Sequence, residues 1–327
     1  MRQHWIVTLM IGSVIWWMLP DRDAGHTARS QVQAAVMFGG FVALDGNRVV
    51  ELDHHGDVRD EVKLASMPAA PRVVGASDRV GLVWRDGHKI AVAGIDHEGS
   101  LGKPQRFGKR VQRVCDGLAT NDHQFAAGWT ESDGVIWFVH GPTMASLAAL
   151  DGGETVPVAV ANNEPCWIAS AGESIALMWR EKRRTLLALC GKKCELGQRV
   201  MLPADATPLG VGCARIGCAV VSRSETGALQ ATWVDTSKRP HRERWTKPLP
   251  SAAREGRVEI VGTGSQVAIA YSTGGEPLVV VANAAGTIAP SWQHAADEIP
   301  SIAWSLGRVL VTHHVGGELR SNSIAVP

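Results

Sequence analysis

Six cysteines are the residues of this sequence best suited to chemistry, and four of them form two close pairs. Three residues separate Cys190 from Cys194, and four separate Cys213 from Cys218. Zinc sites usually have two-residue spacing and a second matching pair of ligands, which neither motif offers. We therefore favour two disulfides that each close a hairpin turn over a metal site, which agrees with an oxidising compartment.

Cys115 and Cys166 precede two similar apolar segments, FAAGW (125–129) and IALMW (175–179), by nearly the same number of residues. They therefore occupy near-equivalent places in successive repeats, and we expect a third disulfide between them. Such a bridge would close a long loop, and the loop-entropy rule makes it the most stabilising of the three.

Histidines and carboxylates give a weaker signal. The pairs His54-His55 and His313-His314 are predicted to lie on opposite faces, so we expect no shared metal site. Acid–base catalysis needs carboxylates that converge on one point. Eight carboxylates lie near the turns between the second and third strands of the repeats described below, but no sequence feature selects one pair of them: Asp45, Asp86, Glu131, Asp133, Glu181, Glu225, Glu276 and Glu318. No G-x-S-x-G motif occurs, and the sequence predicts no catalytic residue, metal or cofactor.

Charged turns are the candidate contacts for a partner. The run from Arg180 to Arg184 holds four basic residues, which suit an acidic partner or lipid headgroups, although a solvated turn is the alternative. The residues that we select for partner binding are Arg85, Asp86, Glu131, Asp133, Arg180, Lys182, Arg183 and Arg184.

The elements that would position these residues recur along the chain. A short apolar segment followed by a polar turn repeats every 39–50 residues, which is the period of four-stranded propeller blades. Its copies are FVALD (41–45), VGLVW (80–84), FAAGW (125–129), IALMW (175–179), CAVVS (218–222), VAIAY (267–271) and VLVTH (309–313). Trp84, Trp129 and Trp179 end three of these strands and are expected to be buried between blades.

This pattern resembles bacterial extracytoplasmic β-propeller repeat proteins. The resemblance implies an all-β fold of about seven four-stranded antiparallel blades, with six or eight as alternatives, over residues 25–327. The Trp-Asp repeat signature and a quinone-docking motif are missing, and the segment 130–137 departs from a sialidase Asp box at Ser132. The seventh repeat lacks an outer strand, and residues 28–38 are candidates to supply it and close the ring.

The N-terminus differs in composition from the rest of the chain. Residues 5–20 carry no charge, and this length lies between a signal-peptide core and a full membrane span. We favour an uncleaved signal anchor within residues 1–24 over a cleaved signal peptide. The protein would then be extracytoplasmic, held in the inner membrane by residues 5–20 or secreted to the periplasm or cell surface.

Composition narrows the functional classes. A net charge of +1 gives no field that attracts nucleic acid. The favoured function is a non-catalytic binding or scaffolding propeller of the cell envelope with a protein or glycan partner. The alternatives are an enzyme that acts on envelope glycans or polymers at the channel mouth, and a subunit of a larger envelope assembly.

Overall fold

The structure is a computed structural model, and its described part begins at residue 32. The described residues are 32–37, 39–76, 79–96, 98–116, 119–120, 125–141, 154–160, 164–171, 174–190, 196–202, 206–237, 239–250, 257–272, 276–296 and 298–326. The predicted membrane segment, residues 5–20, lies outside them. Among the described residues, no helix is long and apolar enough to span a membrane.

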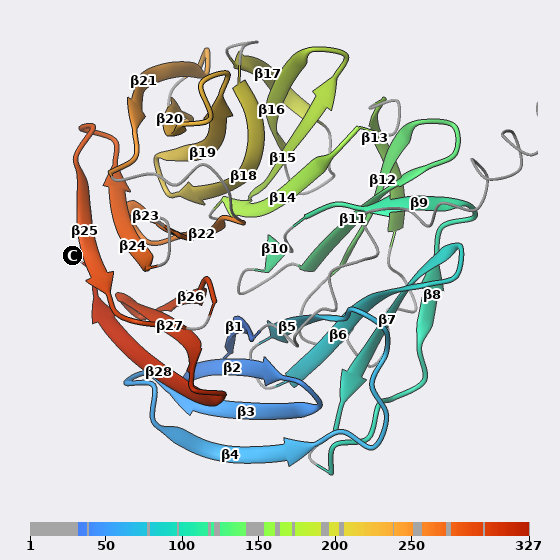
Figure 1. Cartoon of the computed structure of the whole chain (residues 1–327). Helices are drawn as coiled ribbons and strands as arrows, with labels where there is room; N and C mark the ends of the chain where they lie inside the picture. The colour runs from blue at the N-terminus through green and yellow to red at the C-terminus, as the bar shows by residue number, and fades with distance from the viewer. Residues whose placement is uncertain are drawn as a thin grey trace, which may run out of the picture. The chain divides into compact units, whose positions relative to one another are not determined.

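The described residues form seven antiparallel sheets, which Figure 1 shows as blades around a ring. Blade 1 contains β1 (Gln33–Met37), β2 (Gly40–Asp45), β3 (Arg48–Asp53) and β4 (Val58–Lys63). Blade 2 contains β5 (Arg72–Ala76), β6 (Arg79–Asp86), β7 (Lys89–Ile95) and β8 (Gln105–Phe107). Blade 3 contains β9 (Val111–Val114), β10 (Ala119–Thr120), β11 (Phe125–Glu131), β12 (Val135–Gly141) and β13 (Glu154–Val160).

The second half of the chain repeats the arrangement. Blade 4 contains β14 (Cys166–Ala171), β15 (Ser174–Glu181), β16 (Arg184–Cys190) and β17 (Leu196–Leu202). Blade 5 contains β18 (Ala206–Ala214), β19 (Gly217–Ser224), β20 (Leu229–Asp235) and β21 (Arg242–Pro248). Blade 6 contains β22 (Glu259–Gly262), β23 (Gln266–Ser272), β24 (Pro277–Asn283) and β25 (Ile288–Gln293). Blade 7 contains β26 (Ser301–Ser305), β27 (Arg308–Val315) and β28 (Glu318–Ala325). The predicted seven-bladed, all-β fold is confirmed.

Burial explains why the apolar segments do not alternate. Strands in the middle of a blade, such as β2 and β24, are covered on both faces by neighbouring blades and are apolar except for their last residue. Outer strands such as β4 and β21 are mostly exposed and carry the charges. The hydrophobic core is therefore distributed over the interfaces between blades.

Three of these interfaces each contain one of the tryptophans that we predicted to be buried between blades. Trp129 and Trp179 are fully buried and Trp84 is 9% exposed. Each lies near the end of the second strand of its blade and packs against the preceding blade. The expected position of all three side chains is confirmed.

Two blades differ from the prediction. In blade 3 the inner strand is divided into β9 and β10, which both pair with β11. Blade 7 has three strands among the described residues, and the described part of our candidate segment 28–38, residues 32–37, does not provide a fourth. Residues 33–37 of this segment form β1, which pairs with β2 as the inner strand of blade 1. The apolar sequence QAAVM suits this inner position better than an exposed outer edge.

Blades 7 and 1 are joined by bonds that involve side chains, without a shared strand among the described residues. The Ser301 hydroxyl accepts from the Ala34 N–H (2.9 Å). The Ser321 and Ser323 hydroxyls donate to the carbonyls of Gly56 (2.5 Å) and His54 (2.9 Å). These contacts close the ring between its first and last blades.

Disulfides reinforce the ring elsewhere. Cys115 and Cys166 are bonded and join blade 3 to blade 4, where Asp116 also exchanges backbone hydrogen bonds with the strand β14. Cys213 and Cys218 are bonded across the β18–β19 hairpin. Both predicted pairings are confirmed.

Of the two cysteines in the third predicted disulfide, Cys190 alone lies among the described residues. Cys190 is a buried, disulfide-bonded residue at the end of β16. Its predicted partner Cys194 lies outside the described residues, so the Cys190–Cys194 pairing stays a prediction.

Candidate functional site

The turns that we selected from the sequence lie on one face of the propeller. In each blade the turn between the second and third strands points the same way, because consecutive strands are antiparallel and the blades repeat. The connection to the next blade returns to this same face. Two features of this face could serve a function: a polar network at the junction of blades 7 and 1, and a basic turn on blade 4.

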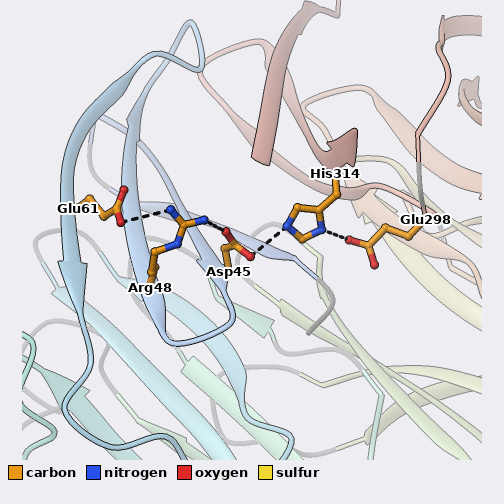
Figure 2. Close-up of polar contacts among 5 residues, drawn as sticks. All are labelled: Asp45, Arg48, Glu61, Glu298 and His314. Atoms are coloured by element: carbon orange, nitrogen blue, oxygen red, sulfur yellow. Dashed lines mark hydrogen bonds and ion pairs between the residues drawn. The ribbon is translucent and has the colours of Figure 1, made fainter. Parts of the chain in front are cut away.

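The first feature, the junction network, joins five side chains in a row (Figure 2). His314, near the end of β27, lies between two carboxylates: its Nδ1 is 2.8 Å from Glu298 Oε1 and its Nε2 is 3.0 Å from Asp45 Oδ1. Arg48 donates to Asp45 and, over 3.4 Å, to Glu61. The network thus connects β2, β3 and β4 of blade 1 with two segments of blade 7.

The junction network contains three carboxylates, one guanidinium and one imidazole, and the residues at its centre are mostly buried. The side chains of His314 and Glu298 are 15% exposed and that of Asp45 is 8% exposed. Each ring nitrogen of His314 faces one of these two carboxylates. The hydrogen bond that Arg48 donates to Asp45 raises the pKa of Arg48.

This network is better suited to structure than to catalysis. Its carboxylate oxygens are engaged by cations of the same network, and it contains no hydroxyl or thiol that could act as a nucleophile. It joins residues 269 positions apart in the sequence and fastens the ring where its two ends meet. We had not predicted it, although one signal exists: Asp45 stands where most other blades have a bulky residue.

Four of the eight turn residues selected from the sequence are bonded near their own turns. Arg85 donates to the carbonyls of Gly87 and Gln112, both at 3.0 Å. Asp86 pairs with Arg106 at 2.6 Å. Two further carboxylates accept from nearby N–H groups: Glu131 from Lys109 N and Trp129 Nε1, and Asp133 from Val135 N. These side chains hold their turns in shape.

The other four residues form the second feature, the blade-4 basic turn, defined as Arg180, Lys182, Arg183 and Arg184. Three of them are exposed and Arg180 is half-buried. Within the part of the chain that the structure describes, none of the four has an ion-pair partner. With Glu181 as the one carboxylate between them, the turn carries a net positive charge.

The backbone of the basic turn is unusual as well. Lys182 has φ = 58°, a conformation that glycine and asparagine adopt more readily than lysine. Glu181 and Arg184 pair across the hairpin, so Lys182 and Arg183 form a two-residue turn at its tip.

A fifth cation lies on the same blade. The guanidinium of Arg199, on the outer strand β17, is 5.6 Å from the centre of the Trp179 ring. Arg199 is exposed, whereas Trp179 is fully buried. The stacking fixes the aliphatic part of Arg199 against the blade and leaves its charge in solvent.

Titratable groups elsewhere serve the fold. Burial raises the pKa of Tyr271, whose hydroxyl donates to the Pro250 carbonyl (2.7 Å). Asp53 is partly desolvated, which raises its pKa, but the N–H groups of Asp57 and His55 reverse this effect and the pKa is lowered overall. In the described ranges, no three His, Cys, Asp or Glu residues are grouped as a metal site would require.

Comparison with known proteins gives the fold and no family. No protein-family model matches the chain, and no curated protein is similar to it in sequence. Solved structures do match. The chain is a seven-bladed β-propeller.

Three of these structures show how general the likeness is. The Dos1 propeller is 11% identical with a TM-score of 0.55, covering 91% of this chain and 93% of that one. The Pseudomonas aeruginosa periplasmic gluconolactonase PpgL is 14% identical with a TM-score of 0.53, covering 92% and 90%. Puromycin hydrolase is 9% identical with a TM-score of 0.56, and the match covers 91% of this chain but only 52% of the hydrolase. At such identities the likeness shows the fold alone.

Proposed function

We propose that this propeller is a non-catalytic binding or scaffolding module of the cell envelope, and that its blade-4 basic turn contacts an acidic protein or glycan. The observation that carries the proposal is a difference in bonding between charged turns on the same face of the propeller. The charged side chains of blades 2 and 3 that we selected are bonded near their own turns. The four cations of blade 4 have no ion-pair partner among the described residues.

Electrostatics explains why this contrast favours a ligand. Like charges on one short turn repel one another, and an anionic ligand relieves that repulsion as well as pairing with each cation. The guanidinium groups of Arg183 and Arg184 can each bind a carboxylate or a phosphate through two parallel hydrogen bonds. An exposed pair contributes roughly 0.2–1 kcal/mol, so several must act together and salt should weaken them.

The location in the envelope is supported by two findings. Disulfides persist in oxidising compartments, and this chain has two between described cysteines. One of the similar solved structures is a periplasmic protein. Both are compatible with an extracytoplasmic propeller, and attachment through residues 5–20 remains part of the proposal.

The alternative of a polymer-acting enzyme has no comparable observation in its favour. Such an enzyme needs two carboxylates free to exchange protons with a substrate. Six of the eight carboxylates expected near these turns, Asp45, Asp86, Glu131, Asp133, Glu276 and Glu318, contact neighbouring protein groups. The other two, Glu181 and Glu225, lie on different blades.

Charge reversal tests the proposal. The double variant Arg183→Glu/Arg184→Glu is compared with Arg59→Glu/Lys63→Glu, which reverses two exposed charges on the outer strand of blade 1. Binding of immobilised polyglutamate and polygalacturonate, an acidic polypeptide and an acidic glycan, is measured by biolayer interferometry at low and high salt.

We expect the wild type to bind one of these probes in a salt-sensitive manner. The blade-4 variant should bind about tenfold more weakly, as the loss of two surface pairs would give, and the blade-1 variant should bind as the wild type does. Equal losses in both variants, or a wild type that binds neither probe, would overturn the proposal.

A further inference from the structure

The outer edge of blade 7 is open in the described structure. In blades 1 to 6 the third strand is covered by a further strand, whereas β28 is the last strand of its sheet. Figure 1 shows β28 outside β27, beside the strands of blade 1. A strand edge of this kind presents unpaired N–H and C=O groups that can pair with another chain.

The register identifies which backbone groups face outward. Val326 N donates to the Gly307 carbonyl (2.9 Å), so the backbone groups of Asn322 and the other even-numbered residues of β28 point toward β27. The groups that remain point away from the sheet and belong to Leu319, Ser321, Ser323 and Ala325. One of them is engaged: the Ser323 carbonyl accepts from Arg308 Nη2 at 3.2 Å. A carbonyl has a second lone pair, so this contact does not block pairing.

This edge lacks two protective residue types that four of the six other outer strands contain, although β8 and β17 lack them as well. Proline and lysine are the usual means of protection. β4 ends with Lys63, β13 contains Pro157, β21 ends with Lys247 and Pro248, and β25 contains Pro290. The sequence of β28, ELRSNSIA, contains neither residue type.

We propose that β28 pairs in antiparallel fashion with β28 of a second copy of this chain, about a two-fold axis at Asn322. The four outward-facing residues are arranged symmetrically about Asn322. Each therefore meets an outward-facing residue of the second copy: Leu319 meets Ala325, and Ser321 meets Ser323. A two-fold contact of this kind closes on itself and does not extend into fibres.

Charge is compatible with a second copy in this register and disfavours a register centred on Arg320. Centred on Asn322, the pairing places Arg320 opposite Ile324 and brings no like charges together. A register centred on Arg320 would place the two arginines face to face. In the register at Asn322, the only side chain that meets its own copy is that neutral, exposed amide.

An apolar side chain beside the edge agrees with a covered surface. Val58 is 63% exposed. It lies two residues from Gly56, whose carbonyl accepts from Ser321 of β28 (2.5 Å). A second copy on this edge would shield it from water.

Sedimentation and cross-linking of the full chain in mild detergent test the pairing. Asn322→Asp places two negative charges at the axis, and Asn322→Cys places two thiols there. The matched controls are Ser291→Asp and Ser291→Cys, on the exposed outer strand β25 next to Pro290. Asn322 and Ser291 both have exposed side chains, so the variants should fold.

We expect a concentration-dependent dimer for the wild type and for Ser291→Asp, and a dimer weakened about tenfold or more in Asn322→Asp. Mild oxidation should link Asn322→Cys into dimers and leave Ser291→Cys monomeric. A wild type that is monomeric at all concentrations would overturn the proposal. So would protection of the outward amides of β28 from hydrogen exchange in a monomer, because another segment of the same chain would then cover the edge.

Discussion

The two described disulfides should differ in how much they stabilise the propeller. Cys115–Cys166 spans 51 residues and joins two blades, whereas Cys213–Cys218 spans five residues within one hairpin. In the chain-entropy model, a cross-link stabilises by restricting the unfolded chain, and its effect grows with the logarithm of loop length. These spans correspond to about 4 kcal/mol for the first bridge and about 2 kcal/mol for the second.

The perturbation is removal of each bridge by paired alanine substitutions. All four cysteines are buried, with exposures of 4% or less. Both double variants therefore lose similar thiol volume, and the difference between them isolates the cross-link. Urea unfolding followed by tryptophan fluorescence gives the free energy of unfolding, because the tryptophans are distributed over the blades.

We expect Cys115→Ala/Cys166→Ala to lose about 2 kcal/mol more than Cys213→Ala/Cys218→Ala. An equal loss in both variants, or a larger loss for the short bridge, would refute the reasoning. In that case the backbone bonds between Asp116 and β14 hold the two blades together without the disulfide.

Three further predictions follow from single residues. His314→Gln should lower the free energy of unfolding by about 1–3 kcal/mol, because Asp45 and Glu298 lose their shared partner in a mostly buried position. The control His55→Gln, at an exposed position, should change it by less than about 0.5 kcal/mol in the same urea titration. Trp179→Ala should cost about 3–5 kcal/mol, since its fully buried ring packs between blades 3 and 4, and a variant as stable as the wild type in thermal unfolding would contradict that packing. In an NMR titration the Asp53 carboxyl should have a pKa below 3.8. Because this pKa is lowered on folding, the carboxylate stabilises the turn at a pH above the pKa of the unfolded chain, and the effect is lost as the pH falls through the pKa of the folded protein. A pKa above 3.8 would contradict the hydrogen bonds from His55 and Asp57.

Local repetition made the fold predictable. Apolar segments such as VAIAY (267–271) are buried on both faces, so their composition alone distinguishes them from half-exposed strands. The Cys115–Cys166 bridge was predictable for the same reason, since equivalent positions in neighbouring repeats lie side by side. The blade-4 basic turn could be read from its charges, but its lack of ion pairs needed the structure.

Ring closure was the part that sequence patterns did not encode. The contact between His314 and Asp45 joins positions 269 residues apart, and no periodicity relates them. The same limit explains the misplaced segment 28–38, because its described residues are apolar enough for an inner strand and the choice depends on how the two ends of the chain meet. The signal anchor over residues 5–20 stays a prediction.

Lysine labelling in the native envelope tests the proposed binding surface most directly. An amine-reactive acetylating reagent is applied to envelope fractions and to the purified protein, and modification is quantified by mass spectrometry at Lys182 of the basic turn. Lys63 and Lys89, both exposed on other blades, are controls within the same molecule. We predict that Lys182 reacts several-fold more slowly in the envelope than in the purified protein, while Lys63 and Lys89 react equally in both. Equal reactivity of Lys182 in the two preparations would contradict the account, because the basic turn would then be uncovered where the protein acts.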